Sequence, residues 1–209
     1  MIQIKAKTIA QAWRESCSKL YSQGKESAVN DFYRHSPAFI EVADTSHNLY
    51  DNNFPMSEKE IKTISNYLIT GKEEDAMIHD WTKIYRQRLF TEKDNQNQIE
   101  NIINYLKKKP TGKRAQASIW NQQKDLYSEI GPCLQIVWVQ ILDNKLEMHI
   151  HMRATDCYGK LLMNMNEFAT LQHYISEKLS LKIGNYIQFI DSLHFNLSDK
   201  NKVDKLLKK

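Results

Sequence analysis

The sequence contains few of the residues that mark disordered or fibrous proteins. Its 209 residues include only six glycines and four prolines, while 41% are apolar and 26% are charged. This composition is ordinary for a globular protein and excludes a low-complexity chain. No linker or repeat divides the sequence, and its length suits one sizeable domain. We therefore expect a single domain over residues 1–209.

Long apolar runs are also lacking. No run reaches the roughly 18 residues that a membrane-spanning helix needs. The first residues lack the apolar core of a signal peptide and predict an amphipathic helix, with Ile9, Trp13, Cys17 and Leu20 on one stripe. We expect a cytoplasmic protein without membrane contact.

Cysteine is scarce. Cys17, Cys133 and Cys157 fit neither a disulfide framework nor the paired spacing of a zinc site, which indicates reduced thiols. His149 and His151 alternate onto one face of a predicted strand, but no third ligand lies at a suitable spacing. We expect no metal site.

The excess of positive charge is small. The formal net charge is +4, and much of it lies in "KKKPTGKR" and "KNKVDKLLKK". No aromatic-interleaved RNA motif or recognition-helix pattern accompanies these runs, so we interpret them chiefly as solvated faces. We expect no nucleic-acid partner, and we treat Lys113 and Arg114 separately below.

The hydrophobic period changes midway along the chain. The first half predicts a strand at 38–44 and helices at 8–22, 57–71, 75–90 and 97–109. The second half predicts a helix at 165–181, a short basic helix at the end, and strands at 114–121, 133–142, 145–153 and 185–195. The Asp143-Asn144 pair suits a hairpin between the two middle strands. This order indicates an α+β fold around one sheet.

Four motifs in the second half keep a fixed order: "PTGKRAQASIWN", "GPCLQIVWVQ", "HMRATDCYGKLLMN" and "DSLHFN". Arg114 precedes Cys133 by nineteen residues, Cys133 precedes Arg153 by twenty, and Asn164 follows Asp156 by eight. In these motifs and ungapped spacings the chain resembles the thymidylate synthase family. The shorter N-terminal half is more similar to the compact archaeal-type members.

The resemblance covers about residues 96–197, and it implies a mixed or antiparallel sheet covered by helices. It also makes Cys133 the nucleophile. A thiolate can add to C6 of a pyrimidine, which turns C5 into an enolate-like carbon able to attack a one-carbon donor. The thiolate needs positive charge and solvent access nearby, and Arg153 on the next predicted strand supplies the charge. Alone, Cys133 would be read as a small buried apolar residue.

The resemblance implies a phosphate site built from two subunits. Arg153 holds the phosphate of a pyrimidine nucleoside monophosphate, and Arg114 and Lys113 reach the phosphate of the opposite subunit in a homodimer. Arg114 keeps the bidentate fork, whereas Lys113 offers a point charge. Arg34 in "YRHSP" is a weaker phosphate candidate from the N-terminal half.

The resemblance assigns the remaining contacts as well. Asn164 reads the pyrimidine edge, and its amide suits uracil, whereas cytosine-specific hydroxymethylating relatives carry Asp there. Asp156 holds the pterin ring of 5,10-methylenetetrahydrofolate. His194 contacts the sugar 3′-hydroxyl, beside Asn196, which stands where the family has Tyr. Asn166 is read as helix surface.

Three further positions depart from the family pattern. Ala154 replaces Ser at the phosphate site, and Leu134 replaces the usual His after the cysteine. The family's essential Glu lies seven residues before a Gly, and counting back from Gly71 gives Ile64. That Glu organises the water used for proton transfer. Glu58 and Glu60 are weak candidates to replace it. We expect the family's closing C-terminal segment to be missing, because the chain ends in "KLLKK".

Three functions follow from these observations. The leading hypothesis is transfer of a one-carbon unit to C5 of a uridine 5′-monophosphate, with dUMP first among the substrates. The altered sugar contact and the missing closing segment keep a nucleotide hydroxymethylase acting on dUMP, dCMP or CMP as an alternative. The missing Glu keeps a non-catalytic nucleotide-binding relative as the third.

Overall fold

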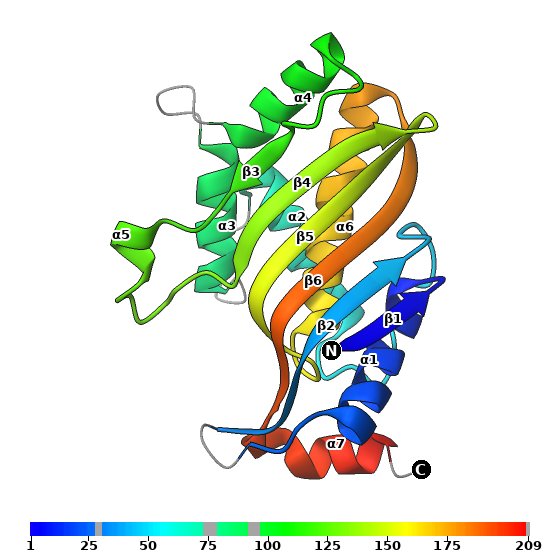
Figure 1. Cartoon of the computed structure of the whole chain (residues 1–209), viewed down its shortest axis with the longest axis vertical. Helices are drawn as coiled ribbons and strands as arrows, with labels where there is room; N and C mark the ends of the chain where they lie inside the picture. Colours follow the sequence, from blue (N-terminus) through cyan, green and yellow to red (C-terminus); the bar gives the residue numbers. More distant parts are fainter. Residues whose placement is uncertain (28–30, 73–78, 92–96, 208–209) are drawn as a thin grey trace.

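The fold is built on one mixed sheet with helices packed on one face (Figure 1). The computed structural model describes residues 1–27, 31–72, 79–91 and 97–207. In the order β1-β2-β6-β5-β4-β3, the strands are Ile2–Ala6, Phe32–Val42, Lys182–Asn196, Lys145–Asp156, Leu134–Leu142 and Gln116–Ser118. The β1–β2 and β6–β5 pairs are parallel and the other pairs are antiparallel.

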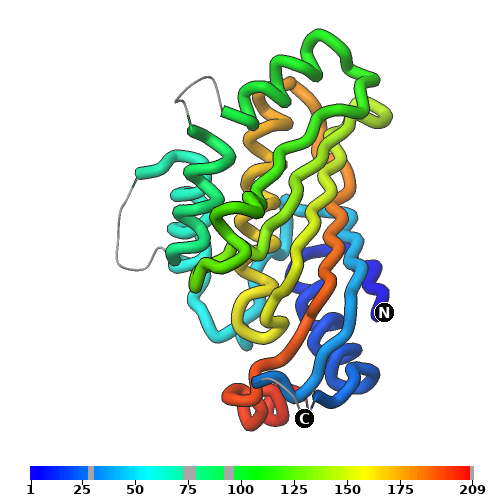
Figure 2. The backbone as a smooth tube through the Cα atoms, turned by 60° about the vertical axis from the view of Figure 1, so that its left-hand side comes forward, coloured from blue at the N-terminus to red at the C-terminus, as the bar shows by residue number. Residues whose placement is uncertain are grey.

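One long helix, α6, organises the covered face of the sheet. It packs against β5 and β6 and also against α1, α2 and α4 (Figure 1, Figure 2). The helices α1 to α7 are Ile9–Gln23, Glu58–Thr70, Asp80–Phe90, Gln98–Lys108, Gln122–Asp125, Leu161–Leu179 and Lys200–Leu207. None of those in the described part is long and apolar enough to cross a membrane.

The alternation of side chains in β5 explains why only one face carries helices. Met148 and Ile150 are buried beneath α6, whereas the intervening His149 and His151 are only partly buried on the opposite face. Successive strand residues point to opposite sides of a sheet, so an apolar-polar alternation buries one side. The predicted α+β fold around a mixed sheet is confirmed.

The predicted helix after Ser57 has the expected ends. Ser57 and Glu60 form a capping box at the start of α2, and Gly71 follows its end with a φ of 63°. Left-handed backbone of this kind favours glycine. The Asp143-Asn144 turn between β4 and β5 also has positive φ at both residues, 48° and 59°, as a two-residue hairpin requires.

Several element boundaries differ from the sequence prediction. Strand β1 was not predicted, although its burial alternates strictly, because five residues give only a short pattern. Strand β2 begins six residues earlier than expected and β3 spans only three residues. Helix α6 begins at Leu161 rather than 165, and α3 begins at Asp80. The predicted helical residues 75–78 lie outside the described part.

Candidate active site

A pocket of about 310 Å³ lies where β5 and β6 end and β4 begins. Because β5 and β6 are parallel, their ends meet, and Asp156 pairs with His194 across them. The hairpin returns the start of β4 to the same edge. Six of the predicted site residues line this pocket: Cys133, Arg153, Asp156, Asn164, His194 and Asn196.

Cys133 stands in the pocket wall, on a backbone held from two sides. Its carbonyl oxygen accepts a hydrogen bond from the backbone N–H of Arg153 at 2.9 Å. The next residue, Leu134, donates its N–H to the hydroxyl of Tyr85 on α3 at 3.2 Å. The thiol is free and partly exposed. A nucleophile fixed at a pocket wall in this way can meet a bound base.

The guanidinium of Arg153 fastens the loop that precedes Cys133. Its Nε donates to the carbonyl of Pro132 at 3.1 Å, and its Nη2 donates to the carbonyl of Gly131 at 2.9 Å. An arginine carries five N–H donors. Two of these donors bond the described residues, and the remaining donors can bind an anion in the pocket that also contains the thiol.

Asp156 is buried at the start of the turn that leads into α6. Its two oxygens accept the backbone N–H groups of Tyr158 and Gly159 at 3.1 and 3.2 Å. Burial raises the pKa of the Asp156 carboxyl to about 6. A Cβ at Gly159 would lie 2.7 Å from Oδ2 of Asp156, so a larger residue there would displace this carboxylate. Asp156 is thus both a turn-capping residue and a pocket residue.

His194 lines the pocket from β6. Its Nδ1 lies 3.1 Å from the carbonyl of Ser192, and its ring stacks on Phe32 at a centroid distance of 3.9 Å. Burial lowers the pKa of His194 to about 4. The neutral ring donates from Nδ1 to that carbonyl, so Nε2 is an acceptor, as a sugar hydroxyl requires. Asn196 lines the pocket two residues farther on.

Asn164 lies in the first turn of α6 and is linked to a carboxyl that sequence reasoning missed. Its Nδ2 donates to Oε2 of Glu167 at 2.9 Å, and the other oxygen of Glu167 accepts from the hydroxyl of Thr82 at 2.8 Å. Glu167 is fully buried, and burial raises its pKa to about 7. The sequence did show Glu167 inside a strongly apolar helix, and this position could have indicated a buried carboxyl.

Helix α3 supplies an aromatic wall that was not predicted either. Trp81 and Tyr85 stand one helical turn apart and both line the pocket. The ammonium of Lys160 lies 4.2 Å from the ring centroid of Trp81. Burial raises the pKa of the Tyr85 phenol, so it stays neutral. An i, i+4 aromatic pair on a predicted helix could have suggested this face.

Three predicted phosphate ligands do not line the pocket of their own chain. Lys113 donates from Nζ to the side-chain oxygen of Gln140 at 2.6 Å, and Arg114 is exposed next to it. Arg34 donates to the carbonyl of Gly24 at 3.0 Å and lies 3.2 Å from Glu26, in a separate hollow near α7.

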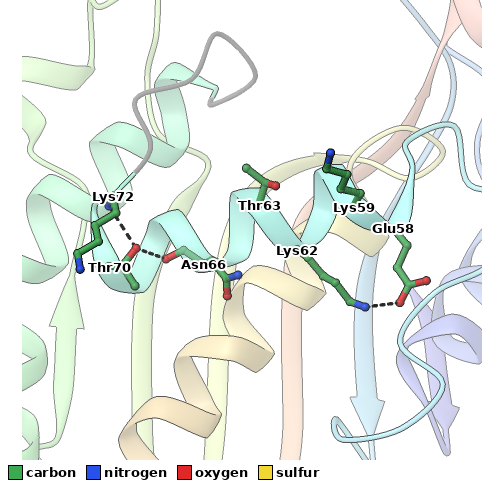
Figure 3. A pocket seen from close by; sticks show the side chains of 7 residues that line it. All are labelled: Glu58, Lys59, Lys62, Thr63, Asn66, Thr70 and Lys72. Carbon is green, nitrogen blue, oxygen red and sulfur yellow. Dashed lines mark hydrogen bonds and ion pairs between the residues drawn. The ribbon is translucent and has the colours of Figure 1, made fainter.

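The position expected for the family's Glu is occupied by a buried isoleucine, Ile64. Neither weak substitute is near the pocket. Glu58 pairs with Lys62 at 2.7 Å on the outer face of α2 (Figure 3), and Glu60 caps that helix through Ser57. Both suggestions were wrong because these carboxylates serve the start of α2 and its solvent side.

The remaining cysteines do not line the pocket. Cys17 and Cys157 are buried with their sulfurs 3.6 Å apart, between α1 and the end of β5. No cluster of three His, Cys, Asp or Glu residues suited to a metal occurs within the described ranges. Asn166 was wrongly read as helix surface: it is buried and donates to the carbonyls of Leu49 and Leu162 at 3.0 and 2.8 Å.

Comparison with known proteins identifies the family of the chain. The sequence model of a family described as "Thymidylate synthase" matches residues 39–209. Three archaeal proteins, each named "Putative thymidylate synthase", are similar over nearly the whole chain. The protein of Methanocaldococcus jannaschii is 28% identical over 93% of this chain and 90% of its own length. Those of Methanosarcina mazei and Methanococcoides burtonii are 25% and 26% identical, each over 98% of this chain and 94% of the relative.

Proposed function

The chain belongs to the thymidylate synthase family. From that premise we propose that it transfers a one-carbon unit to C5 of a uridine 5′-monophosphate, with dUMP as the first candidate substrate. Family membership indicates a transferase of nucleotide biosynthesis. The observation that carries the specific reaction is the gathering of Cys133, Arg153, Asp156, Asn164 and His194 around one pocket. The three free cysteines favour a reducing, cytoplasmic setting.

In this proposal, Cys133 does the covalent chemistry. Its thiolate adds to C6 of the pyrimidine, and the electron pair of the C5–C6 bond moves toward C4=O, which makes C5 nucleophilic. The guanidinium of Arg153 lines the same pocket as the thiol. The same guanidinium has free donors for the substrate phosphate.

The rest of the nucleotide is oriented by two neutral side chains. Asn164 faces the pyrimidine edge from α6, where its amide both donates and accepts. Nε2 of His194 accepts a hydrogen bond from a sugar hydroxyl, because Nδ1 donates to the carbonyl oxygen of Ser192. The low pKa of His194, about 4, keeps this ring neutral at physiological pH.

Asp156 fits the folate co-substrate. Each carboxylate oxygen already accepts one backbone N–H, and each has a second lone pair for a ring N–H group. Trp81 and Ile130 add apolar surface to the same pocket. When bound, 5,10-methylenetetrahydrofolate supplies the one-carbon unit. Asp156 would hold its pterin ring, and no metal takes part in this proposal.

We also propose a homodimer formed through the uncovered face of the sheet. Four partly buried side chains, Phe39, Phe189, His151 and Ile136, form a row across β2, β6, β5 and β4. In the next row, Nε2 of His149 is buried without a hydrogen-bond partner among the described residues. An apolar surface that also carries a polar atom without a hydrogen-bond partner is suited to binding a second copy of the chain.

The dimer gives a role to the two basic residues outside the pocket. Lys113 and Arg114 do not line the pocket of their own chain, and in the dimer they complete the phosphate site of the partner. Mixing inactive Cys133→Ser with inactive Arg114→Ala protein tests this arrangement. A shared site predicts restored activity, since one site of each heterodimer keeps both residues. Absence of restored activity between exchanging subunits would refute it.

The reaction itself is tested by release of tritium from C5 of labelled dUMP in the presence of the folate. Wild-type protein should release tritium, Cys133→Ser should not, and Cys17→Ala should, because Cys17 lies outside the pocket. Equal release by the wild-type and Cys133→Ser proteins would refute the assignment.

Two alternatives rest on particular residues. Asn196 lines the pocket where the family has Tyr, which favours an altered sugar site and hydroxymethylation of dUMP, dCMP or CMP. Mass spectrometry separates this product, which is heavier than the methylated one by about one oxygen. The buried Ile64 favours a non-catalytic nucleotide-binding protein. Any Cys133-dependent turnover would exclude that reading.

A further inference from the structure

A buried hydrogen-bond network stands behind the side chain that reads the base. Glu167 has no exposed surface and does not line the pocket. One of its oxygens accepts from Asn164 at 2.9 Å, and the other accepts from Thr82 at 2.8 Å. Asn164 lies three positions earlier on the same helix and does line the pocket. The network therefore joins a buried carboxyl to the pocket through a single amide.

An amide can present its oxygen and nitrogen in either of two orientations, because rotation about its last bond exchanges them. Uracil offers an N3–H donor and an O4 acceptor, whereas cytosine offers an N3 acceptor and an N4–H donor. One orientation of Asn164 therefore matches uracil, and the flipped orientation matches cytosine. The amide discriminates between the bases only when its orientation is fixed.

Ionised Glu167 fixes that orientation. A carboxylate accepts hydrogen bonds and donates none, so it can face only the NH₂ side of Asn164. A flip would place the amide oxygen against Oε2 across the 2.9 Å that the hydrogen bond now spans. Two acceptors would then meet in a site without exposed surface, where such a contact is costly. Thr82 holds the carboxyl in place from α3.

We propose that Glu167 is a positioning residue that makes the site select uracil over cytosine, by holding the Asn164 amide in one orientation. The inference rests on the proposed function, since that function identifies the base. Glu167 acts through Asn164 and does not touch the nucleotide.

Protonation of Glu167 weakens this selection. Its pKa of about 7 puts the change near neutral pH, and a protonated carboxyl can donate to a flipped Asn164. The ionisable groups facing it are the phenols of Tyr85 on α3 and Tyr186 on β6, whose pKa values burial raises, so both stay neutral. Among the described residues, α1, α2, α4 and β5 add no charged group beside it.

Calorimetric binding of dUMP and dCMP tests the proposal at about pH 8, where Glu167 is ionised. The wild type should prefer dUMP. Glu167→Gln can donate or accept toward Asn164, so this preference should fall by roughly tenfold to a hundredfold, mainly through tighter dCMP binding. Glu177→Gln is the matched control, because Glu177 is an exposed glutamate on the same helix and outside the pocket, so this variant should keep the preference. A folded Glu167→Gln protein with the wild-type preference would overturn the inference.

The wild type provides a test that needs no variant. Its preference for dUMP should fall severalfold when the pH is lowered from about 8 to about 6, because Glu167 takes up a proton. The phosphate groups of dUMP and dCMP take up protons alike, so their titration does not change the ratio of the two affinities. An unchanged ratio overturns the inference. Preferential dUMP binding without turnover would instead count against the proposed reaction alone, whereas no binding of either nucleotide would overturn both.

Discussion

Glu167 makes the stability of this protein fall as the pH rises, opposite to the effect of an ion-paired surface acid. Its carboxyl has an ordinary pKa of 4.5, and burial raises it to about 7 in the folded chain. Between these values the folded state binds more protons than the unfolded state. The free energy of unfolding therefore decreases through this window and levels off above about pH 7. The full shift corresponds to about 3 kcal/mol.

Glu167→Gln removes this titration. Urea unfolding of both proteins at about pH 5 and pH 8 should show their difference in unfolding free energy moving by about 2.5 kcal/mol in favour of the variant at the higher pH. This corresponds to about 5 to 10 °C in Tm for a chain of this size. Asp156 also titrates, with a pKa of about 6, but it is present in both proteins and cancels. A difference that stays constant within about 0.5 kcal/mol would refute the reasoning.

Further predictions concern the turn, an ion pair and the core. Gly159→Ala should raise the KM for the folate roughly tenfold or more, because the new Cβ meets Oδ2 of Asp156 at 2.7 Å; an unchanged KM contradicts the role of this turn. Arg88→Met should cost about 3 kcal/mol in urea unfolding at neutral pH, since Asp125, 4% exposed and doubly bonded to Arg88, loses its partner. Trp13→Phe should cost about 1 to 3 kcal/mol by the same measurement, because a buried carbonyl at 2.9 Å loses its donor. Losses below about 0.5 kcal/mol would contradict either account.

The family resemblance in the sequence indicated the pocket residues that lie on the hairpin, on the segment after it and on β6. The two-residue turn sets the pairing of β4 and β5 as far as Ile136, and a shift of register next to Leu134 then brings Cys133 opposite Arg153. Asp156 follows on the same strand. The spacing to Asn164 covers one turn and the start of α6. Short-range geometry of this kind is encoded in residue order.

The residues that were missed depend on long-range packing. Thr82 reaches Glu167 across 85 positions of sequence, and no local pattern indicates which face of α3 meets α6. Trp81 and Tyr85 join the pocket for the same reason. The absence of a carboxylate at Ile64 was visible in the sequence. The sequence placed Glu167 inside an apolar helix, but it did not show that Thr82 of another helix would bond its carboxyl.

The central position of β6 has a consequence for synthesis on the ribosome. Strands β1 and β2 come from the start of the chain and β3 to β5 from its middle, and only β6 joins the two groups. A nascent chain that has not yet exposed residues 182–196 can therefore pair its strands only as two separate half-sheets with open edges, a state prone to misassociation. His194 and Asn196 lie on that same strand, so nucleotide can stabilise the fold only after the last strand has docked.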